Sequence, residues 1–266
     1  MRSRVLPVML AGSLLLTSCT AHVPAPLPSP AATISAVAPS LGSPAPTVAR
    51  KGPVVVLDPG HNGGNASHPR EIDKPVPAGR GETKPCNTTG TATKSGYPEH
   101  AFNWDVAQRV GALLTARGIL VQYTRQDDNG VGPCVDRRAA FGNDSGAAAV
   151  VAIHADGSTS SSAHGFHVSY SDPPLNEAQG QPSVSLAEAL RDGLRQAGFA
   201  TSTYLGKNGI YPRDDLAGLN LSTRPAALVE CGNMRNAAEA AAMSSPEGRA
   251  RYAQALATAI LAYLKV

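Results

Sequence analysis

The sequence has almost no excess of charge of either sign, because 23 basic and 20 acidic side chains leave a formal net charge of only +3. It contains no basic run and no RNA-binding signature, so a nucleic-acid partner is not expected. It also lacks internal repeats. Beyond the first twenty residues, no apolar stretch is long enough to cross a membrane, and we expect no spanning helix. The 266 residues can bury a full core without metal or disulfide staples.

The N-terminus has the layout of a secretory signal peptide at residues 1–19. Arg2 and Arg4 precede a mostly apolar run at 5–16, which is followed by two small residues. This run is too short to span a bilayer, and nothing after it continues a helix. Residues 16–19, Leu-Thr-Ser-Cys, also look like a bacterial lipoprotein cleavage box. Export to the cell wall or periplasm is therefore predicted, and both a lipid anchor on Cys19 and plain cleavage nearby remain open.

Two regions of different composition follow the signal peptide. Residues 20–51 are rich in Pro, Ala and Ser with almost no charge, which is typical of an extended linker. Residues 52–266 have the mixed composition of one folded domain. Within this domain, 62–98 are rich in Gly, Pro, Thr and Asn and show no periodicity. A loop of that length in a compact domain is usually functional.

The rest of the domain alternates between two patterns. Apolar or β-branched runs predict strands at 54–57, 119–123, 147–153, 165–170 and 226–229. Apolar residues at helical spacing predict helices at 98–118, 136–143, 186–194 and 247–264. This alternation predicts an α/β fold, a single domain with a mostly parallel central sheet flanked by helices on both faces.

Metal-ligating residue types stand at the ends of three predicted strands. His61, His154 and Glu230 each follow a buried run, and Glu99 opens the first long helix. Ligands of open α/β sheets bind just beyond the carboxyl ends of the strands. Catalytic zinc takes three protein ligands and keeps one position open. Taken singly, each residue has an ordinary structural interpretation, as a hydrogen-bonded histidine, a helix-start acid or an ion-pair partner.

The motifs around these residues carry a family resemblance. The run 58–64, Asp-Pro-Gly-His-Asn-Gly-Gly, closely resembles the DPGHGG opening of the zinc-dependent N-acetylmuramoyl-L-alanine amidases of the type-3 family. The family's later motifs occur in order over about 53–265, and mycobacterial cell-wall amidases look most similar. These motifs are Glu99 with Asn103, Thr124-Arg125 with Asp128, Arg138 with Gly142-Asn143, Ile153-His154-Ala155, and Pro225-Ala-Ala-Leu-Val-Glu-Cys-Gly232.

The resemblance implies both a reaction and roles for residues. His61, Glu99 and His154 would bind one zinc ion, and Glu230 would be the catalytic base. The enzyme would hydrolyse the amide bond between N-acetylmuramic acid and L-alanine in peptidoglycan or muropeptides, for cell-wall remodelling or muropeptide recycling. A monomer is expected.

The same motifs imply substrate contacts at Arg125, Arg138 and Asn143.

Several histidines fall outside this set. His100 stands where the family often has Lys and is a rival ligand, although adjacent helix positions point about a quarter-turn apart, which favours only one of Glu99 and His100. His164 and His167 are interpreted as structural or groove-lining. The polar segment 207–215 is a candidate for contact with the peptide.

Three cysteines remain beyond Cys19. Cys86 and Cys134 lie in loop-like sequence, whereas Cys231 follows an apolar run. In an oxidising compartment two cysteines tend to pair, so we predict a Cys86–Cys134 disulfide and a free, buried Cys231. The segment 62–98, tethered through Cys86, is predicted to wall the substrate groove.

Two other function classes compete with the amidase. A cysteine peptidase would use Cys231 with a histidine, although a buried thiol is less reactive. No serine-hydrolase G-x-S-x-G or metalloprotease H-E-x-x-H motif occurs. The second alternative is a non-catalytic, exported, wall-binding lipoprotein that keeps the fold.

Overall fold

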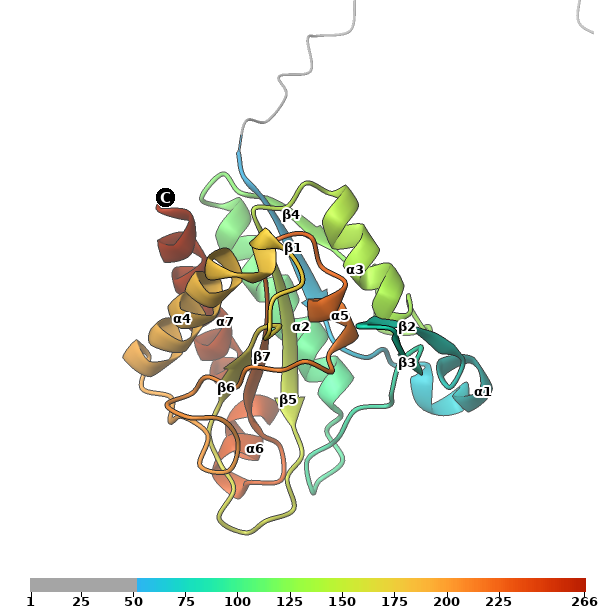
Figure 1. Cartoon of the computed structure of the whole chain (residues 1–266). Helices are drawn as coiled ribbons and strands as arrows, with labels where there is room; N and C mark the ends of the chain where they lie inside the picture. The colour runs from blue at the N-terminus through green and yellow to red at the C-terminus, as the bar shows by residue number, and fades with distance from the viewer. Residues whose placement is uncertain (1–51) are drawn as a thin grey trace, which may run out of the picture. The chain divides into compact units, whose positions relative to one another are not determined.

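A five-stranded sheet forms the centre of the fold, in the order β4-β1-β5-β7-β6 (Figure 1). The computed structural model describes residues 52–266, so the signal peptide, Cys19 and the linker at 20–51 lie outside the described residues. The strands β4, β1, β5 and β7 are parallel, and β6 is antiparallel to β7. Their bounds are β1 Val54–Pro59, β4 Leu120–Tyr123, β5 Ala149–Asp156, β6 His167–Ser169 and β7 Ala226–Asn233. The predicted α/β fold with a mostly parallel sheet is confirmed.

Helices cover the two faces of the sheet unequally (Figure 1). The long helices α2 (Glu99–Thr115), α4 (Gln181–Gln196) and α7 (Pro246–Leu264) lie on one side, with α6 (Ala237–Ser244) leading into α7. The other side carries α3 (Val135–Asp144) and the short α5 (Ala217–Asn220). The main core lies under the long helices, whereas the cluster on the opposite face is small.

Alternation along each strand decides which side chains reach which face. On β5, Val151 and Ile153 point into the main core, whereas Val150 packs into the smaller cluster. His154 is therefore on the same face as Val150, the face that helices cover less completely. The parallel register pairs His154 with Glu230 of β7, which places both side chains on that face.

The helix α2 follows from its apolar spacing. Phe102, Val106 and Val110 are fully buried at helical intervals. Pro98 precedes the helix in an extended conformation, and Gly118 takes a left-handed φ of 81° after it. The first residue of this helix, Glu99, is thereby delivered to the sheet edge.

The segment 62–98 contains more regular structure than its composition indicates. It forms the 3₁₀ turn η1 (Asn65–Ser67), the short helix α1 (Pro69–Ile72) and an antiparallel hairpin of β2 (Pro75–Gly79) and β3 (Glu82–Pro85). The hairpin turn places Gly79, Arg80 and Gly81 at positive φ. Prolines within both strands removed the alternating pattern that would have predicted them.

Two predicted strands end later than expected. The predictions stopped at 153 and 229, but β5 continues to Asp156 and β7 to Asn233. His154 and Glu230 therefore lie within the sheet rather than after it. The short elements α5, α6 and η2 (Glu177–Gln179) were not predicted at all.

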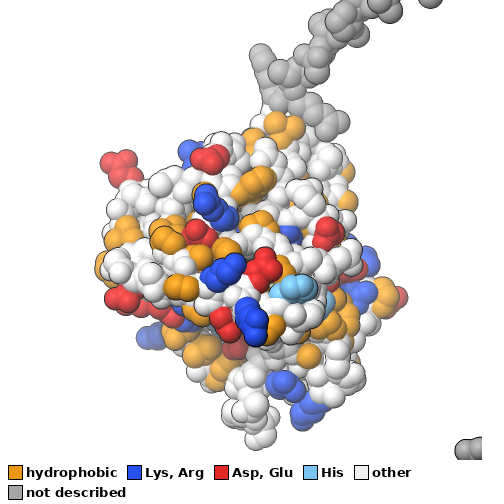
Figure 2. Space-filling view, turned by 90° about the vertical axis from the view of Figure 1, so that its right-hand side faces the viewer, with side chains coloured by type: hydrophobic (Ala, Val, Ile, Leu, Met, Phe, Trp, Pro, Cys, Tyr) orange, Lys and Arg blue, Asp and Glu red, His pale blue; other side chains and the backbone are white. Residues whose placement is uncertain are grey.

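The outer surface of the described domain agrees with the balanced charge. Figure 2 views the side that carries α3 and the hairpin, where acidic and basic side chains are interspersed. Across 52–266, no helix combines the length and apolar character that crossing a membrane requires.

Candidate metal centre

Three predicted metal ligands meet at the carboxyl end of the sheet. His61 follows β1, Glu99 begins α2 and His154 lies on β5, and one ligand atom from each lies within 4.8 Å of the others. The Oε1 atom of Glu99 is 3.1 Å from Nε2 of His61 and 3.1 Å from Nδ1 of His154. Two imidazoles and one carboxylate form the kind of donor set that catalytic zinc sites use.

Glycine allows these side chains to approach one another. A Cβ atom on Gly60 would lie 2.1 Å from the His154 ring, and one on Gly90 would lie 2.8 Å from both Glu99 and His61. Gly90 also has a φ of 75°. Any larger residue at either position would displace a candidate ligand.

Backbone groups fix the orientation of two ligands. The Nδ1 atom of His61 is 3.0 Å from the carbonyl oxygen of Thr88, which leaves Nε2 facing Glu99. The second carboxylate oxygen of Glu99 accepts a hydrogen bond of 2.9 Å from the amide of Thr91. Such outer contacts commonly set the tautomer and orientation of metal ligands. The contacts of Thr88 and Thr91 were not predicted, because the type of a side chain does not reveal which groups the backbone of that residue contacts.

The charges of Glu99 and the two histidines influence one another. Burial acts to raise the pKa of Glu99, but the nearby His61 and His154 hold it well below its usual value. Burial likewise acts to lower the pKa of His61, and the Glu99 carboxylate more than offsets this and raises it. A carboxylate that stays ionised in a buried site is suited to binding a cation.

Glu230 faces the same space from β7. Its Oε2 atom is buried and has no hydrogen-bond partner. Burial, together with the negative charges of Glu99 and Asp156, raises the pKa of Glu230 well above its usual value. An unpartnered buried carboxylate is costly, and such groups occur mainly where function requires them.

A cavity of about 480 Å³ connects these residues with the less covered face of the sheet. The walls of the cavity come from the segment that contains the β2–β3 hairpin, from α3 and from α5. The cavity is also lined by Glu230 and the three candidate ligands, His61, Glu99 and His154. The hairpin side contributes residues such as Lys84 and Thr88, as expected for a segment that walls the site. Lys84 donates a hydrogen bond of 2.6 Å to the carbonyl of Asp215, which ties the hairpin to the opposite wall.

The three residues expected to contact substrate all form hydrogen bonds within the protein; Arg125 and Arg138 are buried, whereas Asn143 is half-buried. Arg125 is 2% exposed and donates to the carbonyls of Pro59 and His100, so it has no surface to offer a ligand. Asn143 bonds to backbone atoms of Leu221 and Thr223. Among the three, Arg138 alone lines the cavity, and its guanidinium is also engaged by the protein.

The additional histidines do not join the metal cluster. His100 lies 2.7 Å from Asp128 through its Nδ1 atom, which favours Glu99 over this rival. His164 is hydrogen-bonded to the carbonyl of Ser162. His167 is buried opposite Glu230 on β6, and burial lowers its pKa to about 4. Neither belongs to the candidate ligand group, which agrees with the predicted structural or groove-lining role.

The cysteines pair as predicted. Cys86 and Cys134 form a disulfide, and Cys231 is free and buried. Burial raises the pKa of the Cys231 thiol well above its usual value. A thiol that resists ionisation is a poor nucleophile, which removes the main support for a cysteine peptidase.

Comparisons with known proteins agree with this geometry. The family model described as N-acetylmuramoyl-L-alanine amidase matches residues 55–262. The N-acetylmuramoyl-L-alanine amidase Rv3717 of Mycobacterium tuberculosis is 47% identical over 232 residues, covering 87% of this chain and 95% of that protein.

Two solved structures are similar in both sequence and fold. The amidase Ami1 of Mycobacterium smegmatis has a TM-score of 0.78 and 51% identity, covering 80% of this chain and 97% of its own. The apo form of Ami1 from Mycobacterium abscessus has a TM-score of 0.77 and 52% identity, covering 80% and 99%. The chain therefore belongs to the N-acetylmuramoyl-L-alanine amidase family, enzymes that hydrolyse the amide bond between N-acetylmuramic acid and L-alanine in peptidoglycan.

Proposed function

We propose that this amidase works with one zinc ion held by His61, Glu99 and His154, and with Glu230 as its general base. The observation that carries the proposal is the arrangement of the four side chains. Three ligand atoms lie within 4.8 Å of one another, and the unpartnered oxygen of Glu230 lies on the same face of the sheet. The donor set fits zinc, because two imidazoles and one carboxylate leave a coordination position free.

The chain's own residues carry the proton transfers. When bound, zinc supplies Lewis acidity that polarises a carbonyl and makes water easier to deprotonate. Glu230 accepts the proton of the attacking water and then delivers it to the nitrogen of L-alanine as the amide bond breaks. A raised pKa suits both halves of this cycle, because the carboxyl must release the proton as readily as it takes it. Its place on a central strand keeps the carboxyl in position.

The proposed substrate is peptidoglycan or a muropeptide derived from it, and the proposed site of action is outside the cytoplasm. The signal-peptide layout at 1–19 supports export, and Cys19 is a proposed lipid-attachment site. We propose that the enzyme acts as a monomer. Direct substrate contact is retained as a proposal for Arg138, which lines the cavity.

Metal content and turnover, measured together on site variants, test these roles. We expect the native protein to hold one zinc ion by elemental analysis, and His154→Ala to lose both zinc and activity. Glu230→Gln should keep zinc and lose activity by at least about 100-fold, as expected for loss of a general base. His164→Ala is the matched histidine control and should keep both.

Full turnover by the zinc-loaded Glu230→Gln variant would exclude Glu230 as the base. A native protein that binds zinc and muropeptide without cleaving it would favour a wall-binding protein instead.

A further inference from the structure

The backbone conformation of the ligand His61 requires support from its surroundings. His61 has a φ of 59°, in the left-handed region that non-glycine residues rarely occupy. Such residues persist only where neighbouring groups over-determine the conformation. Two separate segments of the chain supply this support, one containing Thr88 and the other containing Arg138.

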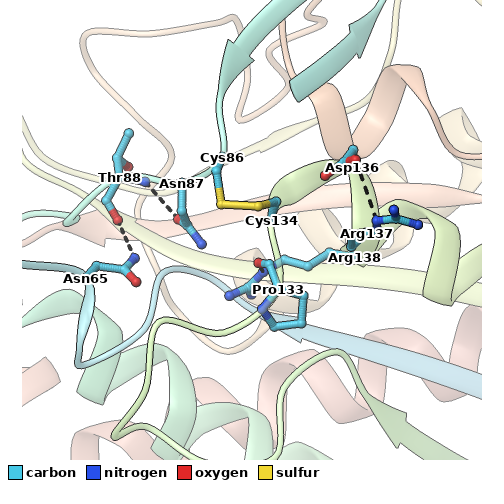
Figure 3. Close-up of a disulfide and its surroundings, with 9 residues drawn as sticks. All are labelled: Asn65, Cys86, Asn87, Thr88, Pro133, Cys134, Asp136, Arg137 and Arg138. Carbon is cyan, nitrogen blue, oxygen red and sulfur yellow. Dashed lines mark hydrogen bonds and ion pairs between the residues drawn. A yellow bond between two sulfur atoms is a disulfide. The ribbon is translucent and has the colours of Figure 1, made fainter. Parts of the chain in front are cut away.

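The first segment holds the side chain of His61. The carbonyl oxygen of Thr88 lies 3.0 Å from Nδ1 of His61 and also accepts a hydrogen bond of 2.7 Å from Asn65. The amide of Thr88 is in turn bonded to the side chain of Asn87 at 2.8 Å. Figure 3 shows Asn87 and Thr88 directly after Cys86, with the side chain of Asn65 directed at Thr88. The position of the imidazole therefore depends on where the chain runs just past this cysteine.

The second segment holds the backbone of the same loop. The guanidinium of Arg138 donates to the carbonyl of His61 at 2.9 Å and to the carbonyl of Pro59 at 2.8 Å. It also pairs with the carboxylate of Asp58 at 2.8 Å. Arg138 is 3% exposed, and its own Nε is fixed by the carbonyl of Pro133, one residue before Cys134.

The disulfide joins these two segments. Cys86 and Cys134 are bonded to each other (Figure 3), and the amide of Val135 donates to the carbonyl of Cys86 at 2.9 Å. The disulfide therefore links the segment that holds the imidazole of His61 to the segment that holds the backbone of His61.

We propose that the Cys86–Cys134 disulfide and Arg138 are positioning elements for the metal ligand His61, so that zinc affinity, and not only stability, depends on them. This inference rests on the proposed zinc site. It also gives Arg138 a role in holding His61, in addition to any contact with substrate. Outer partners of metal ligands typically change metal affinity by about 10–100-fold when removed.

The test is the zinc affinity of the metal-free protein, measured by competition with a fluorescent chelator. We expect the Cys86→Ser/Cys134→Ser double variant to bind Zn²⁺ at least about 10-fold more weakly than the native protein. Arg138→Lys keeps the charge, but a single ammonium group cannot reach the four acceptors that the guanidinium contacts, so it should weaken binding by a similar factor. It also serves as the decisive variant if the double serine variant does not fold.

Leu190→Ala is the matched control for lost stability. Leu190 is fully buried in α4, under the other face of the sheet, so this variant should melt at a lower temperature and keep native zinc affinity. Native affinity in both the disulfide and the Arg138 variants would overturn the positioning role, as would an equal loss in Leu190→Ala. A native protein that binds no zinc would instead overturn the proposed function.

Discussion

At the scale of single residues, the role proposed for Glu230 as a general base requires a charge that destabilises the folded domain. Its carboxyl is buried with one oxygen unpartnered, and the negative charges of Glu99 and Asp156 add to the cost of ionising it. A general base must nevertheless be ionised to accept a proton. The folded domain would therefore be more stable if the Glu230 carboxyl carried no charge.

This conflict predicts a pH-dependent gain in stability for Glu230→Gln. Because the folded pKa is raised, the group's contribution is fully present below the unfolded pKa and is lost as pH rises through the folded pKa. Glutamine is neutral throughout and loses nothing. In metal-free protein, we expect the variant's advantage in unfolding free energy to grow as pH rises above the ordinary glutamate pKa, reaching roughly 1–3 kcal/mol.

Urea unfolding at several pH values measures this difference. A variant no more stable than the native protein at the upper end of the pH range would show that the carboxylate is not destabilising. Glu247→Gln, an exposed acid in the first turn of α7, is the control and should show no such trend.

The three candidate ligands could be proposed from sequence, but the residues that orient their side chains could not. His61, Glu99 and His154 were recognisable because strand ends gather at one sheet edge and the motifs have a fixed order. For Arg125 and Arg138, the sequence does not reveal that each guanidinium donates to backbone carbonyls of the protein itself, so this supporting role could not be predicted. Thr91 acts through its backbone amide and Thr88 through its carbonyl as well as its hydroxyl, and most of these contacts do not depend on the identity of the side chain.

At the scale of elements, the β2–β3 hairpin forms the cavity wall and depends on contacts outside itself. Its carbonyl at Ala78 accepts a hydrogen bond of 3.1 Å from the buried side chain of Asn220. Asn220 also donates to the carbonyl of Asp214 and accepts from the hydroxyl of Ser171. One amide thus joins the hairpin, α5 and the end of β6.

Removal of this amide should therefore destabilise the domain. We expect Asn220→Ala to lower the free energy of unfolding by roughly 1–3 kcal/mol, because it leaves several buried polar groups without partners. Asn129→Ala is the matched control, since Asn129 is exposed and should change stability by less than about 0.5 kcal/mol. Chemical denaturation compares the two, and equal stabilities would argue against the amide's bridging role.

The hairpin also marks the limit of prediction for elements. Strands with β-branched runs and the helix α2 with its apolar spacing were predictable, because the apolar residues within each element's own sequence indicate which side chains are buried. The hairpin was not, because prolines interrupt both of its strands and its stability comes from distant partners such as Asn220. The extensions of β5 and β7 were missed because their polar residues, His154 and Glu230, look like strand ends.

At the scale of the whole described domain, the site follows from unequal coverage of the sheet. Three long helices bury one face completely, so the side chains that alternate onto the other face border a cavity. Parallel strand order then brings the loop after β1, the end of β5 and the middle of β7 to one edge. We therefore propose that a zinc-dependent amidase site lies at this edge.

The zinc dependence of the cleavage is tested by mass spectrometry of a muramoyl-peptide digested by the purified 51–266 fragment, with and without a chelator. We expect free peptide beginning at L-alanine together with intact muramic acid, lost on chelation and regained when zinc is returned. Undiminished cleavage in the chelated, zinc-free protein would contradict the assignment of His61, Glu99 and His154 to a catalytic metal.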